Sequence, residues 1–434
     1  MKPTPRARQS LAVVLLAMLA PLAAFPAPLF CSDPAGPSTS PTPSASPAWD
    51  VAALNGKILQ AEEFIWSRFY SPETNLFYDY LTSFEQGRGL DHLPRPDEID
   101  NLVPNTCGYG TGMEDCMISA GVMMAAVLAR LEVDGDRDLA AERAARIFDG
   151  IERCVESLPG EGFVARGMSP FAPGKFYIGT SRDQVTHAEV GMWNYYRSEL
   201  PDEPTRERIR NCARHVADRM VRNAVPENGY DFLRADGARC QYGICTMDGK
   251  MPHEAARLAM VYAIAWDVTG DPAYRDLWRK IVSESARKSL NPAPDTAPWG
   301  LLQMEESLRV LDTLEPDPEI KATLRAAAGQ AGVVSAGHFP HLRGNLGRKD
   351  LDAVAPDWRE VGGLVDPYRS AWYFPRECGE MSLAILNAPG RQYTEEDFDF
   401  LCAVVDRIDF SHSSTCGIFD LVAAWWKARK ALCR

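Results

Sequence analysis

The sequence predicts an all-α fold in which six helical hairpins form two concentric rings. Charge-decorated helices alternate along the chain with helices that are almost entirely apolar, and a helix that is apolar all round is a buried one. Each apolar helix also begins with a cluster of polar or aromatic residues. We therefore expect a closed helical toroid, with these clusters gathered at one mouth of the inner ring.

The outer helices are expected where apolar residues recur at helical spacing among charged ones. In the first of them, Leu54, Ile58 and Ile65 form such a stripe. The six outer helices are expected at residues 51–69, 138–157, 202–223, 271–290, 317–334 and 394–408.

The inner helices are expected at 113–132, from Ser181, from Pro252, and at 299–314, 376–386 and 416–431. Residues 117–129 carry no charge, and Gly121 lets a neighbouring helix approach closely. Ser181 suits an N-cap, Pro252 suits a first turn, and Pro375 is expected to restrict where the fifth inner helix begins.

The loops before the inner helices are expected to line the mouth. Segment 162–179 contains Gly, Pro and alternating apolar residues, which favours a loop with a short β-hairpin. The fold class is thus an (α/α)6 toroid with short β-hairpin loops at one mouth.

The N-terminal segment is typical of a secretory signal. Lys2, Arg6 and Arg8 precede an apolar run at 11–22 and then small residues, so we expect a signal peptide at 1–31. A Pro/Ser-rich linker follows at 32–49, and the catalytic domain covers 50–434. The expected location is secreted or periplasmic, with a lipoprotein anchor at Cys31 as the less favoured alternative.

Composition limits the partners of this chain. The 434 residues are 46% hydrophobic and 24% charged, as in an ordinary soluble protein. The net charge of −13 repels phosphate backbones, which excludes nucleic acid as a partner. The apolar run at 11–22 is too short to span a membrane, and no membrane span is expected elsewhere.

The cysteines indicate disulfides or buried thiols in an exported protein. Cys107 lies near Cys116 in the sequence, and Cys240 lies near Cys245, but spacing leaves the connectivity open. No Cys-x-x-Cys pair is present, so we expect no metal and no cofactor.

The first polar cluster holds Tyr109, Glu114 and Asp115. Adjacent carboxylates point about 100° apart on a helix, so one of the two is expected to face the mouth. The alternative is that they cap the helix and complement its dipole. The string at 108–112 lacks a preceding strand and a following Lys-Ser/Thr, so it does not indicate nucleotide binding.

The second cluster holds Arg166, Arg182, Asp183 and His187. Asp183 and His187 are four residues apart and share a helix face, where a carboxylate orients a histidine for proton transfer. Arg166 or Arg182 would hold a substrate carboxylate. The alternative is an Arg–Asp network that fastens the loop to the barrel.

The third cluster is His253 and Glu254 followed by Arg257. Arg257 stands where a zinc-protease signature has its second histidine, so zinc is not indicated. The remaining mouth residues are Trp299, Tyr368, Arg369, Trp372, Tyr373, Arg376 and Glu377. Aromatic faces suit sugar stacking and arginine suits an acidic substituent, although aromatic residues at helix starts also serve as core plugs.

Two strings carry a family resemblance, Cys-Gly-Tyr-Gly-Thr-Gly-Met-Glu-Asp-Cys at 107–116 and Gly-Thr-Ser-Arg-Asp-Gln-Val-Thr-His at 179–187. With the helix pattern over 50–432, they make the chain resemble the six-hairpin (α/α)6-barrel superfamily. Its members include glycoside hydrolases, polysaccharide lyases and sugar epimerases. The second string resembles sugar-site segments of uronic-acid-handling members such as unsaturated glucuronyl hydrolases. Their catalytic aspartates do not match this chain residue by residue, so no catalytic role is carried over.

We therefore expect an exported glycoside hydrolase that acts on an acidic, uronic-acid-containing oligosaccharide or polysaccharide. Asp183 is the first choice as general acid or base, with Asp115 or Glu114 as its partner, because glycoside hydrolysis usually uses two carboxyl groups. The expected substrate-binding residues are Arg166, Arg182, Tyr109, Trp299, Arg369 and Trp372.

Three alternatives remain open at this point. A polysaccharide lyase would neutralise a uronate with Arg166 or Arg182 and abstract its C5 proton with His187 or His253. A sugar epimerase would move a proton between paired histidines, but its usual free-sugar substrates are cytoplasmic. A non-catalytic glycan-binding protein would use the same surface without acid–base geometry.

Overall fold

The computed structural model describes residues 49–362, 368–389 and 391–432. The expected signal peptide at 1–31 and all but the last residue of the 32–49 linker lie outside the described residues. Within the described ranges the chain is mostly helical, with one two-stranded sheet. The all-α fold class is therefore confirmed.

The six charged helices begin at polar caps. Aspartate side chains accept a backbone N–H in the first turn of five of them, and Thr394 caps the sixth within a capping box. These caps explain why the observed starts lie within one residue of the expected ones. The helices are α1 (Val51–Arg68), α4 (Arg137–Val155), α6 (Glu203–Asn223), α8 (Pro272–Lys288), α10 (Pro318–Ala336) and α13 (Glu395–Arg407).

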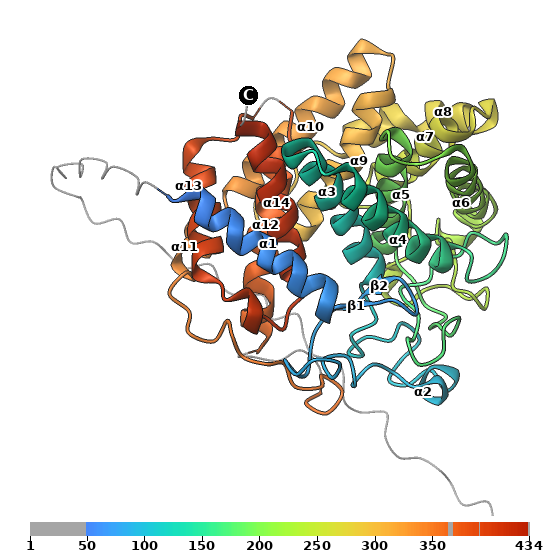
Figure 1. Cartoon of the computed structure of the whole chain (residues 1–434). Coiled ribbons are helices and arrows are strands. Elements are labelled where there is room, and N and C mark those ends of the chain that lie inside the picture. Colours follow the sequence, from blue (N-terminus) through green and yellow to red (C-terminus); the bar gives the residue numbers. More distant parts are fainter. Residues whose placement is uncertain (1–48, 363–367, 390, 433–434) are drawn as a thin grey trace, which may run out of the picture. The chain divides into compact units, whose positions relative to one another are not determined.

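The six apolar helices alternate with the charged ones along the chain, as predicted. Each packs against the next one in sequence, and the last packs against the first, so their contacts follow a cyclic order. Figure 1 shows α3 and α14 near the middle of the view, with α5 and α7 on one side and α12 on the other. The helices are α3 (Cys116–Asp134), α5 (Arg182–Arg197), α7 (Arg257–Thr269), α9 (Pro298–Leu314), α12 (Tyr368–Asn387) and α14 (Gly417–Leu432).

Glycine allows the closest helix contact. A Cβ atom on Gly121 of α3 would lie 2.5 Å from the backbone oxygen of His187 on α5. One turn further along α5, a Cβ atom on Gly191 would lie 3.2 Å from the Cα atom of Gly121. The predicted role of Gly121 in close approach is thus confirmed.

Three inner helices begin elsewhere than predicted. Helix α3 begins at Cys116 and not at residue 113. Pro252 opens a single 3-10 turn (Pro252–Glu254), and α7 itself begins only at Arg257. Helix α12 begins at Tyr368 and runs through Pro375, which lies inside it. A proline removes one helical hydrogen bond and crowds the preceding turn, but packing against α14 and α9 holds that turn helical.

The β-hairpin predicted within 162–179 is wrong, since that segment contains no strand. Its backbone groups bond elsewhere. The Ala165 N–H donates to the Cys154 carbonyl at the end of α4, and the Ser169 N–H donates to the Lys175 carbonyl across a loop. The one hairpin among the described residues pairs β1 (Tyr70–Ser71) with antiparallel β2 (Leu76–Phe77).

Two long loops pack on each other beside the hairpin. Residues 70–111 contain the short helix α2 (Pro96–Asp100), and residues 335–368 contain α11 (Phe339–Gly344). The Tyr80 ring stacks on Trp358 at 4.0 Å between centroids, and Arg359 forms an ion pair with Glu98 at 2.5 Å. In Figure 1, β1, β2 and α2 lie together at the lower edge of the helices.

Of the two cysteine pairs that are close in sequence, Cys240 and Cys245 form a disulfide, whereas Cys107 and Cys116 are separate buried thiols. This bond is compatible with an extracellular or periplasmic location. Among the described residues, α3 is the one helix that is long and apolar enough to cross a membrane. Most of its residues are buried within the protein, as in the core helix of a globular protein. The expectation that the chain has no membrane span stays a prediction.

Candidate active site

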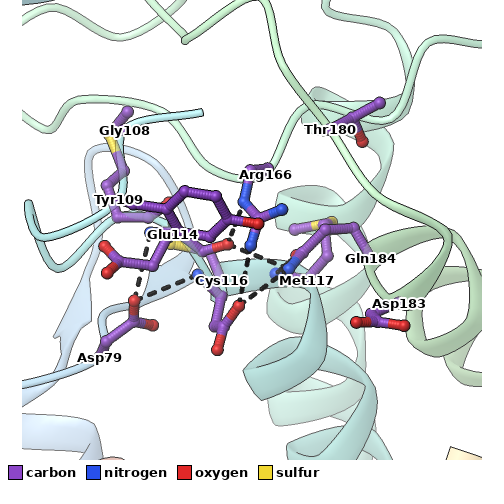
Figure 2. A network of polar contacts seen from close by, with 12 residues as sticks. Asp79, Gly108, Tyr109, Glu114, Cys116, Met117, Arg166, Thr180, Asp183 and Gln184 are labelled. Carbon is purple, nitrogen blue, oxygen red and sulfur yellow. Dashed lines mark hydrogen bonds and ion pairs between the residues drawn. The ribbon is translucent and has the colours of Figure 1, made fainter. Parts of the chain in front are cut away.

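The N-terminal ends of the apolar helices carry side chains that bond to one another. Asp115, the N-cap residue of α3, accepts hydrogen bonds from three side chains. Figure 2 shows this region, with Glu114, Arg166 and Gln184 near the first turn of α3. Asp115 Oδ1 accepts from Arg166 Nη2 at 3.2 Å and from Gln184 Nε2 at 3.1 Å, and its Oδ2 accepts from Arg376 Nη1 at 3.2 Å. Segments from α3, α5, α12 and the 162–179 loop thus meet at one carboxylate.

Glu114 points away from Asp115, as expected for adjacent carboxylates. Its two oxygens accept the N–H groups of Gly110 and Gly112, each at 2.8 Å. Both glycines have positive φ, which suits residues without a side chain. Burial raises the pKa of Glu114 to about 7, and its side chain holds the 108–112 loop in place.

Asp79 is a member of this network that sequence reasoning missed. Its Oδ2 accepts the N–H groups of Glu114 at 3.2 Å and Asp115 at 3.1 Å, just before α3 begins. Burial raises its pKa well above the ordinary range. Asp79 follows β2 within a segment predicted only as a long loop; the flanking aromatic residues Tyr78 and Tyr80 were the available signal of burial.

Asp183 pairs with Arg257 and not with His187. Arg257, the first residue of α7, is wholly buried and bonds to the Asp183 carboxylate through Nη1. The Asp183 side chain is 28% exposed. Although burial opposes ionisation, the Arg257 guanidinium holds the pKa of Asp183 below its ordinary value. Asp183 is therefore an ionised carboxylate that solvent can reach. In Figure 2 it lies on α5 apart from the bonded group of Glu114, Arg166 and Gln184.

His187 lies one turn further along α5, within the group of apolar helices. Burial lowers its pKa to about 4, so its ring is neutral at pH 7. We predicted that Asp183 pairs with His187 on one face of α5. In the structure Asp183 forms an ion pair with Arg257 of α7. The sequence did not indicate this partner, because α5 and α7 are brought together only by the fold.

Arg182 and His253 lie on either side of Glu254. Arg182 Nη2 bonds to Glu254, and Arg182 Nη1 donates to the Gly243 carbonyl at 2.9 Å, next to the disulfide. His253 stands edge-on against Trp299, with ring centroids 5.8 Å apart. Burial lowers the pKa of His253, and among described residues its Nδ1 has no hydrogen-bond partner.

A cavity of about 440 Å³ opens at the start of α9 and along the first half of α12, and His253 contacts its wall residue Trp299. Trp299 and Tyr373 form aromatic walls, and Glu377 of α12 and His341 of α11 also line the cavity. Burial raises the pKa of Glu377. Arg369 is exposed, with its guanidinium 5.7 Å from the Tyr373 ring centroid.

The other predicted contact residues differ in exposure: Tyr109 is exposed, whereas Trp372 is buried. Tyr109 is 40% exposed and covers the buried Arg166, whose guanidinium lies 4.6 Å from the ring centroid. Trp372 is buried, and its indole N–H donates to the Asp79 carbonyl at 3.4 Å. Trp372 therefore packs as a core plug, the alternative considered for aromatic residues at helix starts.

The described residues contain one group that has the spacing of metal ligands, namely Asp231, Cys240 and Cys245. Both sulfur atoms belong to the disulfide, so this group has no thiolate to offer. The chemistry available at the helix ends is instead that of carboxyl groups, neutral imidazoles and arginines. No model of a protein family matches this chain, and no curated protein matches it.

Proposed function

We propose that the protein is an exported glycoside hydrolase acting on an acidic oligosaccharide or polysaccharide, built on an (α/α)6 toroid. The cyclic contacts of the apolar helices and the meeting of their N-terminal ends support the toroid. One observation carries the reaction: Asp183, in the first turn of α5, is exposed to solvent and paired with Arg257, whereas Glu377, on α12, lines the 440 Å³ cavity, and the pKa values of the two carboxyl groups are displaced in opposite directions. Such a pair divides acid and base roles between two similar groups.

In this proposal Glu377 donates a proton to the leaving glycosidic oxygen. Its raised pKa keeps more of it protonated than an ordinary glutamate. Asp183 is ionised, and it acts on the opposite side of the sugar as base or nucleophile. Glu377 takes the partner role expected of Asp115 or Glu114, because protein donors already occupy the oxygens of those two residues.

The substrate is held by the aromatic walls and by Arg369. Trp299 and Tyr373 face the cavity and suit stacking on sugar rings. Arg369 is exposed beside them and suits a uronate carboxylate. Arg166 and Arg182 bond to Asp115 and Glu254, so we assign them to positioning.

The first test is incubation of residues 32–434 with a panel of uronic-acid-containing glycans. Reducing ends and the ultraviolet absorbance of a new double bond are followed together. Reducing ends that rise alone support hydrolysis. Saturable glycan binding without any product contradicts the enzyme proposal and favours a binding protein.

The role of Asp183 is tested by Asp183→Asn. The amide still accepts a hydrogen bond from Arg257 but carries no charge, so kcat is expected to fall by at least about 10²-fold. Circular dichroism and the thermal midpoint check that the fold is kept. Near-normal turnover in this variant contradicts the assignment.

A polysaccharide lyase is the second candidate, favoured by His253. Burial lowers the pKa of His253, so its imidazole is neutral, as abstraction of a C5 proton requires, and the ring contacts the cavity wall residue Trp299. If the ultraviolet signal rises with the reducing ends, His253→Gln is expected to abolish both. Loss of both signals in this variant with Glu377→Gln unaffected would transfer the proposal to the lyase.

A further inference from the structure

A second, larger cavity lies at the other end of the apolar helices. It has a volume of about 840 Å³ and is lined by the C-terminal parts of α3, α5, α9, α12 and α14. Helix α5 runs from Asp183 at the candidate active site to Arg197 at this cavity, a rise of about 20 Å. The cavity is therefore separate from the site described above.

Cations dominate its lining in a protein of net charge −13. Five arginines and lysines line it with two glutamates. Three of these cations have acidic partners of their own: Lys430 pairs with Glu132, Arg137 with Glu199, and Arg197 with Asp267. Helix C-termini attract cations, but this effect falls off within the last turn. It accounts for Arg197 and Lys430, which lie in the last turns of α5 and α14. Arg309 and Lys427 lie more than a turn before their helix ends and need another explanation.

Arg309 and Lys427 share a single carboxylate at the floor of the cavity. Glu306 accepts from Arg309 Nη2 at 2.7 Å and lies 3.6 Å from Lys427 Nζ. Asn387 completes the floor by accepting from Lys427 Nζ at 2.9 Å and donating to Glu306 at 3.0 Å. Two cations on one carboxylate leave a positive charge at a floor where Lys427 is only 20% exposed.

The position of this charge determines how the groups titrate. Arg309 and Lys427 outweigh burial and lower the pKa of Glu306 to about 2. Burial lowers the pKa of Lys427, although Glu306 opposes that shift. An added anion at the floor would restore the balance of charge around Lys427.

We infer that this cavity is a binding site for a small organic polycarboxylate, with one carboxylate on Lys427 and another on Lys430 in place of its present partner Glu132. The two lysines are three residues apart on α14 and so lie on one face. The volume suits an organic ligand, and Leu128, Leu131 and Leu386 provide apolar walls for its carbon skeleton. This inference is independent of the proposed function.

The test is calorimetric titration of residues 32–434 with citrate, in buffer of constant ionic strength. Sodium chloride and glucose serve as the inorganic and uncharged comparisons. Citrate is expected to bind saturably and the other two are not. Lys427→Met keeps the apolar stem and removes the charge, so the citrate Kd is expected to rise about tenfold or more.

Lys57→Met is the matched control. Lys57 lines a separate groove that also contains Arg68 and Arg407, so its removal lowers the net charge equally. Citrate affinity unchanged in Lys57→Met supports the site. Equal weakening in both variants shows general charge attraction and overturns the inference, as does binding that Arg369→Gln abolishes, which would place citrate at the candidate active site.

Lys427→Met also removes a partner of Glu306, so its thermal midpoint is measured first. If that variant does not fold, acetylation of the folded wild-type protein gives the answer by mass spectrometry. Citrate is expected to slow acetylation of Lys427 and Lys430 and to leave Lys57 unaffected. Equal labelling with and without citrate overturns the inference.

Discussion

Asp183 and Glu377 show how the surroundings of a carboxyl group decide its role. Asp183 faces a buried guanidinium that favours its charged form. Glu377 lies in a partly buried aromatic setting that disfavours charge. The two residues lie on different helices, α5 and α12, and their neighbours come from other parts of the fold. Neither environment can therefore be inferred from the residues adjacent in sequence.

These opposite shifts predict a bell-shaped pH dependence of kcat/KM. Asp183 must be ionised, so activity is lost as pH falls through its lowered pKa, below the ordinary value of 3.8. Glu377 must be protonated, so activity is lost as pH rises through its raised pKa, above 4.5. Initial rates across the pH range measure both limbs.

Glu377→Gln is expected to remove the alkaline limb and the cleavage of natural glycosides. Aryl glycosides with good leaving groups need less protonation, so they retain turnover in this variant. Glu395, an exposed residue at the start of α13, gives the matched control Glu395→Gln, which leaves the profile unchanged. An alkaline limb that persists in Glu377→Gln contradicts the role of this residue.

Glu189 is a buried carboxyl group outside the candidate site. It is wholly buried on α5, and both of its oxygens lack a partner among described residues. Burial raises its pKa well above the ordinary 4.5. Because the folded state binds this proton more tightly than the unfolded chain, the free energy of unfolding falls as pH rises above about 4.5.

Glu189→Met is therefore expected to stabilise the protein more at pH 8 than at pH 4. Urea unfolding at the two pH values measures the difference. Glu63→Met changes an exposed glutamate of α1 and should show no such difference. A pH-independent effect of Glu189→Met would contradict the burial of a protonated carboxyl group at this position.

Helix boundaries in this protein follow the capping residues. Aspartates or threonine begin all six charged helices, and these positions were predictable because a cap acts within one turn. Four apolar helices, α3, α5, α7 and α9, have no such bond from their N-cap side chain. The Ser181 hydroxyl at the start of α5, for example, is buried without a partner in the described part of the chain. Their starts are decided by tertiary contacts such as those of Asp79 and Arg257.

The packing of α3 on α5 predicts a strong effect of Gly121→Val. The new side chain would meet the His187 backbone, which cannot move aside as a flexible side chain does. We expect a loss of about 1–3 kcal/mol or more in the free energy of unfolding, measured by urea unfolding.

Gly56→Ala in α1 is the control for this change. A Cβ atom at Gly56 has no other atom within 4 Å, so alanine is expected to stabilise the helix by up to about 1 kcal/mol. Equal effects of the two substitutions would show that helix propensity, and not the α3–α5 contact, governs both.

At the scale of the whole molecule, the charge of −13 opposes an acidic substrate at long range. Salt screens this repulsion over about 8–10 Å, whereas the contact with Arg369 acts at short range. We therefore expect kcat/KM for a uronate glycan to rise between about 10 and 150 mM salt, measured by initial rates. A neutral aryl glycoside should be insensitive to salt, and a fall for the uronate glycan would contradict this view.

The sequence by itself determined the all-α class, the alternation of charged and apolar helices, and most of the charged-helix starts. Hydrophobic periodicity and helix capping depend on residues that are close in sequence, so they can be recognised from the sequence alone. It also indicated the polar clusters of Asp115, Asp183 and His253.

Only the tertiary structure decided the partners within those clusters. Asp79 caps α3 from a loop, Arg257 pairs with Asp183 from another helix, and Trp372 turns into the core. The tertiary structure also brings Lys427 of α14 next to Glu306 and Arg309 of α9, which are far from it in sequence. Ion pairing and burial depend on distances across the fold, and no local pattern of residues encodes them.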